Sequence, residues 1–323
     1  MMQILVGGTA PPRLGRRLST KKERSCYFSL KSAIDSSAMS SPHPFPPDRS
    51  NDRSTDGSTV RPLAPAPLIG VFDSGSGGLS VLAALQRRLP EDALLYIGDL
   101  AFAPYGERET AAVIERSQRV VEWLVDQRAT LIVVACNTAT VLAIGAMRER
   151  WPAIAFVGVE PGVKPAAAVT RTGRIAVMAT PATAASARLR YLVEAYGSGV
   201  HVHIAPCPGL ASAIEAGAVD FASLQAVLET PCAGIRAAEV DTVVLGCTHY
   251  PFIAPVIQQL LGDKVSLIDT ATAVAERVAV VRGSALPTAA SVRVTSTGAS
   301  TEMARLLRRC AAFDGIEIEG VSI

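Results

Sequence analysis

The chain has 323 residues, of which 49% are hydrophobic, so it is long enough to form two domains with sizeable cores. Its 31 basic and 29 acidic side chains nearly cancel, and this balance gives no reason to expect nucleic acid or another polyanion as a partner. Six cysteines are scattered without a CxxC pair, which excludes a secreted disulfide scaffold and favours a reduced, cytoplasmic setting. No apolar run approaches the roughly 20 residues of a bilayer helix, so we expect no membrane segment.

The N-terminal stretch has a different composition from the rest of the chain. Residues 1–66 are rich in Ser, Pro and Arg, and residues 40–67 show no apolar period that could bury a core. We therefore expect a disordered extension. Its basic, serine-bearing start suggests a targeting segment, but an upstream start codon with true initiation near Met39 is the simpler explanation.

Alternating strand and helix patterns begin at residue 68. The predicted strands of the first half follow apolar and β-branched runs, and they cover residues 68–72, 93–97, 131–135 and 155–159. Helices with one apolar face are predicted after the first three of these strands, over residues 79–89, over 107–127 and up to about 150. Strands that alternate with helices indicate parallel βαβ crossovers and three-layer αβα domains with mainly parallel sheets.

The same pattern restarts in the second half of the chain. Strands are predicted at residues 174–179, 200–205, 241–248, 265–268 and 292–296. Helices are predicted up to 196, over 221–238, up to 261, from 270 onward and over 301–311. Pro231 lies inside the second of these helices, and we expect it to break the helix because proline lacks the backbone donor.

The two halves repeat at nearly one period. Residues 69–74 align with 175–180 at an offset of 106, and Cys136 and Cys247 lie 111 residues apart. This spacing suggests two similar α/β domains that arose by internal duplication. The first domain is predicted to comprise residues 67–161 plus 270–323 and to carry Cys136. The second is predicted to comprise residues 162–269 and to carry Cys247, with the active site in the cleft between them.

Cysteine stands at the end of two predicted buried strands, in TLIVVACNTAT and in DTVVLGCT. A single buried cysteine is usually a small hydrophobe, and we assign that role to Cys26, Cys232 and Cys310. Cys136 and Cys247 differ, because the carboxyl ends of parallel strands are the usual ligand site and a following helix can lower the pKa of a thiol. The pair is therefore predicted to be functional.

Two thiols that face each other suit one kind of reaction. Inverting a carbon that bears hydrogen requires a base on one face and an acid on the other, and the two groups exchange roles in the reverse direction. Asp73, at the end of the first strand, and His249, beside the second cysteine, are placed to tune which sulfur is charged.

Three other interpretations stay open at this point. The glycine corner GSGG after the first strand, with Asp99 further on, suggests a dinucleotide site, although Ser80 replaces the third glycine of that motif. A Cys/His hydrolase would use His249 and leave one cysteine idle. A zinc site would draw on one of two sets that lack metal-finger spacing, Cys247 with His249 or Cys207 with His201 and His203.

Four motifs together resemble the glutamate racemases, cofactor-independent enzymes of the aspartate/glutamate racemase superfamily. They are FDSGSGGLSVL at 72–82, YIGD with APYG at 96–106, ACNTAT at 135–140 and LGCTHYPF at 245–252. The resemblance implies interconversion of L- and D-glutamate by two-base proton transfer, without metal, pyridoxal phosphate or nucleotide, to supply D-glutamate for bacterial peptidoglycan. An aspartate racemase and a non-catalytic amino-acid-binding or regulatory module are the alternatives. A homodimer is left open.

The resemblance also implies roles for individual residues. Cys136 is similar to the base that acts on D-glutamate and Cys247 to the base that acts on L-glutamate, with Asp73 beside the first and His249 beside the second. Glu215, eight residues after Cys207, is implied as a further catalytic group that would otherwise pass for a surface charge. Substrate contacts are implied for Asp73, Ser74, Pro104, Tyr105, Gly106, Asn137, Thr138, Thr180, Thr183, Thr248 and His249. The sequence departs from the family at Ala179 and at residues 209–211.

Overall fold

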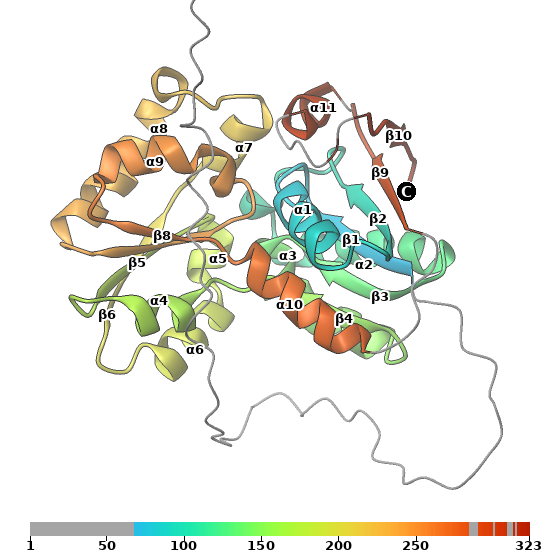
Figure 1. The fold of residues 1–323 in the computed structure, drawn as a ribbon, viewed down its shortest axis with the longest axis horizontal. Helices are drawn as coiled ribbons and strands as arrows, with labels where there is room; N and C mark the ends of the chain where they lie inside the picture. The colour runs from blue at the N-terminus through green and yellow to red at the C-terminus, as the bar shows by residue number, and fades with distance from the viewer. Residues whose placement is uncertain (1–67, 284–289, 300, 309–312, 314) are drawn as a thin grey trace, which may run out of the picture. The chain divides into compact units, whose positions relative to one another are not determined.

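The computed structural model describes residues 68–283, 290–299, 301–308, 313 and 315–323 (Figure 1). The predicted N-terminal extension, the start proposed at Met39, and Cys26 and Cys310 lie outside these residues. Within the described ranges, no helix combines the length and the apolar character needed to cross a membrane.

Six parallel strands form the first sheet, in the order β10-β9-β2-β1-β3-β4. They are β1 (Leu68–Asp73), β2 (Ala93–Gly98), β3 (Ala129–Val134), β4 (Ala155–Gly158), β9 (Ser291–Ser296) and β10 (Ile318–Gly320). One face packs on α1 (Leu79–Arg88), α10 (Ala271–Arg282) and α11 (Thr301–Leu307). The other face packs on α2 (Thr110–Asp126) and α3 (Asn137–Arg150), which explains why the central strands are apolar throughout.

Four parallel strands form the second sheet, in the order β6-β5-β7-β8. They are β5 (Arg174–Ala179), β6 (His201–Pro206), β7 (Thr242–Gly246) and β8 (Ser266–Ile268). Helices α7 (Leu210–Glu215), α8 (Phe221–Ala237) and α9 (Ala254–Leu261) cover one face. Helices α4 (Val163–Val169) and α6 (Ala187–Tyr196) cover the other, and the short elements η1 (Tyr105–Glu107), α5 (Pro181–Ala185) and η2 (Tyr250–Ile253) connect strands to helices.

The two sheets share one topology. The order β2-β1-β3-β4 in the first sheet matches β6-β5-β7-β8 in the second. Their registers match as well, since Phe72 pairs with Val134 while Met178 pairs with Leu245, and these pairs are related by the two sequence offsets. The predicted fold class, two αβα domains with mainly parallel sheets, is confirmed, whereas the exact domain boundaries stay a prediction.

The prediction that Pro231 breaks its helix is wrong. Helix α8 runs without interruption from Phe221 to Ala237, and Pro231 is buried within it. Burial of the ring and its neighbours in the core compensates for the missing backbone donor.

Other differences concern helix boundaries. The single helix predicted up to residue 196 is divided at Ser186, whose hydroxyl accepts a hydrogen bond from Leu189 N at 3.1 Å and caps α6. The helix predicted from residue 107 begins at Thr110, after the turn η1. Helix α4 and strand β10 have no counterpart in the prediction.

Candidate active site

Both candidate cysteines lie at strand ends, where the sequence predicts them. Cys136 precedes α3 as its N-cap residue, just beyond the end of β3. Cys247 directly follows β7. The two residues are only 5% and 6% exposed. Each sheet therefore presents one buried thiol, and the two strands that carry the thiols occupy equivalent places in the two sheets.

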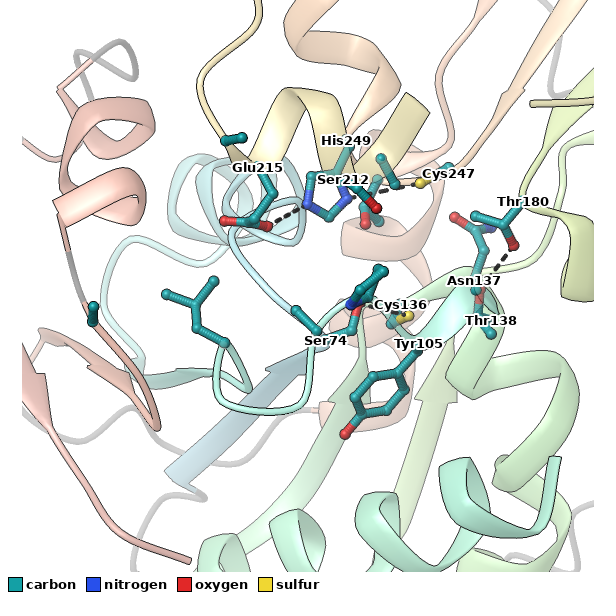
Figure 2. Close-up of a pocket in the computed structure, with 18 residues that line it drawn as sticks. Ser74, Tyr105, Cys136, Asn137, Thr138, Thr180, Ser212, Glu215, Cys247 and His249 are labelled. Atoms are coloured by element: carbon teal, nitrogen blue, oxygen red, sulfur yellow. Dashed lines mark hydrogen bonds and ion pairs between the residues drawn. The ribbon is translucent and has the colours of Figure 1, made fainter. Parts of the chain in front are cut away.

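One cavity of about 360 Å³ is lined by residues that follow strands of both sheets (Figure 2). Its size suits a small molecule. No Lys or Arg side chain belongs to the lining formed by the described residues. The lining residues are Ser74, Leu100, Ala103, Pro104, Tyr105, Gly106, Cys136, Asn137, Thr138, Thr180, Ala211, Ser212, Glu215, Ala216, Cys247, Thr248, His249 and Ala299.

Cys136 sits in an environment that favours the neutral thiol. Its Sγ lies 3.4 Å from Ser74 Oγ, to which it donates, and 3.5 Å from Ala139 N, which donates to it. Burial, reinforced by the negative charge of Asp73, raises the pKa of the Cys136 thiol to about 12. The expectation that the helix would lower this pKa is therefore wrong, because desolvation outweighs the contribution of the helix N-terminus.

Cys247 sits beside a charged relay of two side chains. Its Sγ lies 3.8 Å from His249 Nδ1, and His249 Nε2 lies 2.6 Å from Glu215 Oε2. Burial opposes a charged ring, but the contacts with Cys247 and Glu215 raise the pKa of His249 well above its ordinary value. Burial likewise opposes charge on Glu215, yet its bond to His249 keeps the pKa of that carboxyl below its ordinary value. Cys247 therefore faces an imidazolium.

Asp73 connects the two strand-end clusters. Its carboxylate is fully buried and accepts hydrogen bonds from Gly75 N at 2.8 Å and from Thr248 Oγ1 at 2.9 Å. Desolvation, partly offset by the charge of His249, raises the pKa of Asp73 to about 6. The acid expected beside the first cysteine therefore also touches the residue next to the second one.

The remaining predicted site residues gather around the same cavity. Thr138 Oγ1 lies 3.0 Å from Thr180 Oγ1, a contact that bridges the ends of β3 and β5. Asn137 lines the cavity, and its Nδ2 donates to Val159 O at 3.3 Å. Thr183 is fully buried behind Thr180, with its Oγ1 3.1 Å from Thr180 Oγ1, so like Asp73 it lies outside the lining.

The sequence-based prediction missed part of the lining. Ser212 lies one helical turn before Glu215 on α7, so the implied role of Glu215 was a signal that could have identified it. Its Oγ is buried without a hydrogen-bond partner among the described residues. The other missed residues are Leu100, Ala103, Ala211, Ala216 and Ala299, and their apolar side chains carry no group that would mark them as site residues, although Ala103 belongs to the APYG motif.

The geometry weighs against the rival interpretations. Among the described residues, no group of three or more His, Cys, Asp or Glu side chains is arranged to hold a metal ion. Asp99 is fully buried and bonded to Arg116, so it does not present its carboxylate to a ribose. A hydrolase built on Cys247 and His249 would leave the thiol of Cys136 in the same cavity without a role.

Comparisons with known proteins bear on the same residues. Residues 69–278 match the family model described as Asp/Glu/Hydantoin racemase. The chain is 45% identical over 243 residues to glutamate racemase from Pseudomonas aeruginosa (strain UCBPP-PA14), a match that covers 74% of this chain and 92% of that relative.

Two of the similar solved structures contain glutamate. Escherichia coli glutamate racemase in complex with L-glutamate and the activator UDP-MurNAc-ala has a TM-score of 0.70 and 32% identity, covering 80% of this chain and 99% of that chain. Glutamate racemase from Francisella tularensis subsp. tularensis SCHU S4 in complex with D-glutamate has a TM-score of 0.70 and 27% identity. The match covers 80% of this chain and 98% of that chain. Because the family model matches 210 of its 323 residues, more than half of its length, this chain belongs to the Asp/Glu/hydantoin racemase family.

Proposed function

We propose that this chain interconverts L-glutamate and D-glutamate, with Cys136 and Cys247 as the two groups that move the proton. The observation that carries the proposal is the single cavity lined by both thiols, each supplied by a different sheet. The similar proteins named glutamate racemase, of which one structure holds L-glutamate and another D-glutamate, support this choice of substrate. In this role the protein would act in the cytoplasm and supply D-glutamate for bacterial peptidoglycan.

The electrostatic asymmetry of the site favours one resting state. The imidazolium of His249 lies next to Cys247 and stabilises a thiolate there, whereas Cys136 keeps its proton. From this state the Cys247 thiolate takes the α-proton of L-glutamate and leaves its electron pair on the α-carbon. The Cys136 thiol then gives its proton to the opposite face, which yields D-glutamate, a Cys247 thiol and a Cys136 thiolate. The reverse reaction retraces these steps.

Glutamate carries two carboxylates, and the chemistry of the lining suits them. Because the described lining holds no Lys or Arg, we assign the carboxylates to hydroxyls and backbone N–H groups of lining residues. Ser74, Thr138, Thr180 and Thr248 supply hydroxyls at four strand ends. When neutral groups bind the carboxylates, the electrostatic field at the thiols is determined mainly by Asp73, Glu215 and His249, and these three residues set the charge of the thiols.

The experiment that tests the proposal follows α-hydrogen exchange of glutamate in D₂O, using dialysed, metal-free protein. The native protein should exchange the α-hydrogen and racemise both enantiomers, while Cys136→Ser and Cys247→Ser should abolish racemisation and still bind glutamate. Cys232→Ser is the matched control, since Cys232 is a fully buried core residue outside the cavity lining. Native turnover in both strand-end variants would refute the two-thiol mechanism, and absence of exchange by the native protein would refute the proposed activity.

A further inference from the structure

Asp99 is a buried acid for which the proposed mechanism has no use. It directly follows β2, and its side chain has no exposed surface. Its Oδ1 accepts hydrogen bonds from Arg116 Nη2 at 2.6 Å and Thr297 Oγ1 at 2.7 Å. Its Oδ2 accepts from Arg116 Nε at 2.8 Å and Tyr105 Oη at 2.7 Å. Both oxygens therefore have two donors each, and one of these donors belongs to the cavity lining.

That donor, Tyr105, is fixed on several sides. Its ring centroid lies 6.1 Å from that of Phe72 and 5.7 Å from that of Phe102, the latter in an edge-on contact. Burial and the neighbouring charge of Asp99 raise the pKa of Tyr105 well above its ordinary value, so the hydroxyl keeps the proton that it donates. With the ring packed and the hydroxyl bonded, the backbone of Tyr105 has little freedom.

The backbone next to Tyr105 makes a close approach to the opposite sheet. A Cβ added to Gly106 would lie 2.7 Å from Thr180 Cβ, so the Gly106 main chain packs against the Thr180 side chain with no room for a further side chain between them. Pro104, Tyr105 and Gly106 all line the cavity. A shift of Tyr105 would therefore move the part of the cavity wall that residues 104–106 form.

We infer that Asp99, clamped by Arg116, is a positioning residue that acts through the Tyr105 hydroxyl to hold the wall formed by residues 104–106 in its substrate-binding geometry. The inference rests on the proposed function, because it takes the cavity to be the glutamate site. Arg116 is suited to this task, since its planar guanidinium binds both oxygens of the Asp99 carboxylate. The carboxylate is thereby held in one orientation, in which it accepts the hydrogen bond from the Tyr105 hydroxyl. Small displacements of groups that position a substrate can greatly lower its binding affinity or the reaction rate.

A second ion pair of the same type provides a matched control. Asp92 Oδ1 lies 2.6 Å from Arg282 Nε, and the two side chains are 3% and 12% exposed. The pair Asp99–Arg116 has nearly the same burial, at 0% and 13%. Neither Asp92 nor Arg282 belongs to the cavity lining. Loss of the control pair should therefore affect stability alone.

The experiment is a double-mutant cycle of Asp99→Asn and Tyr105→Phe, with Asp92→Asn as the control. KM for glutamate, kcat and the melting temperature are measured for each variant. Each single substitution should raise KM roughly tenfold, the loss expected for one hydrogen bond to a charged group, with a smaller fall in kcat. The double variant should have the KM of the weaker-binding single variant, because Asp99 acts through the hydroxyl that Phe lacks. Asp92→Asn should lower the melting temperature and leave KM unchanged.

Two results would overturn the inference. One is a native KM in folded Asp99→Asn, and the other is a double variant in which the two effects multiply to about 100-fold. If Asp99→Asn does not fold, Arg116→Lys takes its place in the cycle, because lysine keeps the positive charge but cannot make the bidentate hydrogen bonds of Arg116 to Asp99. If the native protein does not racemise, the proposed function has failed by itself, and calorimetric Kd values for glutamate across the same cycle still decide the role of Asp99.

Discussion

At the scale of single residues, the two thiols are equivalent in sequence and unlike in surroundings. Cys136 faces the negative charge of Asp73 and the hydroxyl of Ser74, whereas Cys247 faces the charged ring of His249. The duplicated strands fix where the sulfurs lie, but the neighbours that decide their charge differ between the halves. A two-base enzyme benefits from this difference, since its resting state needs one acid and one base.

Asp73 should make stability depend on pH. Its carboxyl is fully buried and its pKa rises from 3.8 to about 6 on folding, so the folded state binds the proton more tightly than the unfolded chain does. Stability from this group is therefore complete below about pH 4 and is lost as the pH rises through about 6, at a cost of about 3 kcal/mol.

Asp73→Asn removes this titration. The variant should gain stability relative to the native protein between about pH 4 and 6, keep that gain at higher pH, and lose racemase activity. Melting temperatures of both proteins across this pH range measure the effect. A difference between the two that does not change with pH would contradict the prediction.

Only part of the candidate site could be predicted from the sequence. Cys136, Cys247 and the residues around them could be predicted because strand-end polar groups gather at one edge of a parallel sheet. Ser212 could be inferred only through its place one helical turn before Glu215 on α7, and Ala299 could not be predicted, since it depends on a long-range approach of the segment after β9.

At the scale of elements, strands were more predictable than helices. Parallel strands buried on both faces must be apolar throughout, so β1, β3, β5 and β7 stand out as continuous runs. Helices depend more on context. Pro231 is tolerated because its site is packed, and the cap that divides α5 from α6 depends on how the Ser186 hydroxyl is oriented.

A single carboxylate ties the turn after α4 to β7. Asp241 accepts hydrogen bonds from Thr170 Oγ1 at 2.6 Å, Arg171 N at 2.7 Å and Thr172 N at 2.9 Å. Burial opposes the charge, but these bonds lower the pKa of Asp241 to about 2. Its contribution to stability is therefore present above about pH 4 and is lost as the pH falls toward 2.

Asp241→Asn should accordingly destabilise the protein by roughly 1.5–3 kcal/mol at pH 7, the value of a hydrogen bond to a charged group. The difference from the native protein should shrink as the pH falls from about 4 toward 2, because the unfolded chain then binds a proton at Asp241 that the folded state does not yet bind. Chemical unfolding at pH 7 and at pH 3.5 or below tests this. An equal difference at both pH values would show that the charge of Asp241 contributes nothing to the turn.

At the scale of the whole molecule, the cavity exists because two similar sheets meet at their carboxyl ends. The bonds of Asp73 with Thr248 and of Thr138 with Thr180 connect the residues that follow the strands of the two sheets, and three more contacts have the same role. Ser76 N donates to Glu215 Oε2 at 2.9 Å, and Gly209 N donates to Glu107 Oε1 at 3.1 Å. The third is the close approach of Gly106 to Thr180. Because each sheet supplies one thiol, the distance between the sulfurs depends on these contacts.

Gly106→Ala tests whether this approach is needed. The added Cβ would lie 2.7 Å from Thr180 Cβ, a separation that real side chains do not adopt, so residue 106 and Thr180 must move apart. We expect a KM for glutamate raised at least tenfold, or a loss of turnover, because the cavity wall and the spacing of the thiols both shift.

Gly145→Ala is the matched control for the same chemical change. Gly145 lies inside α3, where an added Cβ meets nothing within 4 Å, so the substitution should stabilise the protein by about 0.5–1 kcal/mol through helix propensity alone. Its KM and kcat should equal those of the native protein. Steady-state kinetics and melting temperatures of the two variants separate the effects. If folded Gly106→Ala binds and turns over glutamate as the native protein does, the two sheets are not held at a fixed spacing by this contact, and the distance between the thiols must be set elsewhere.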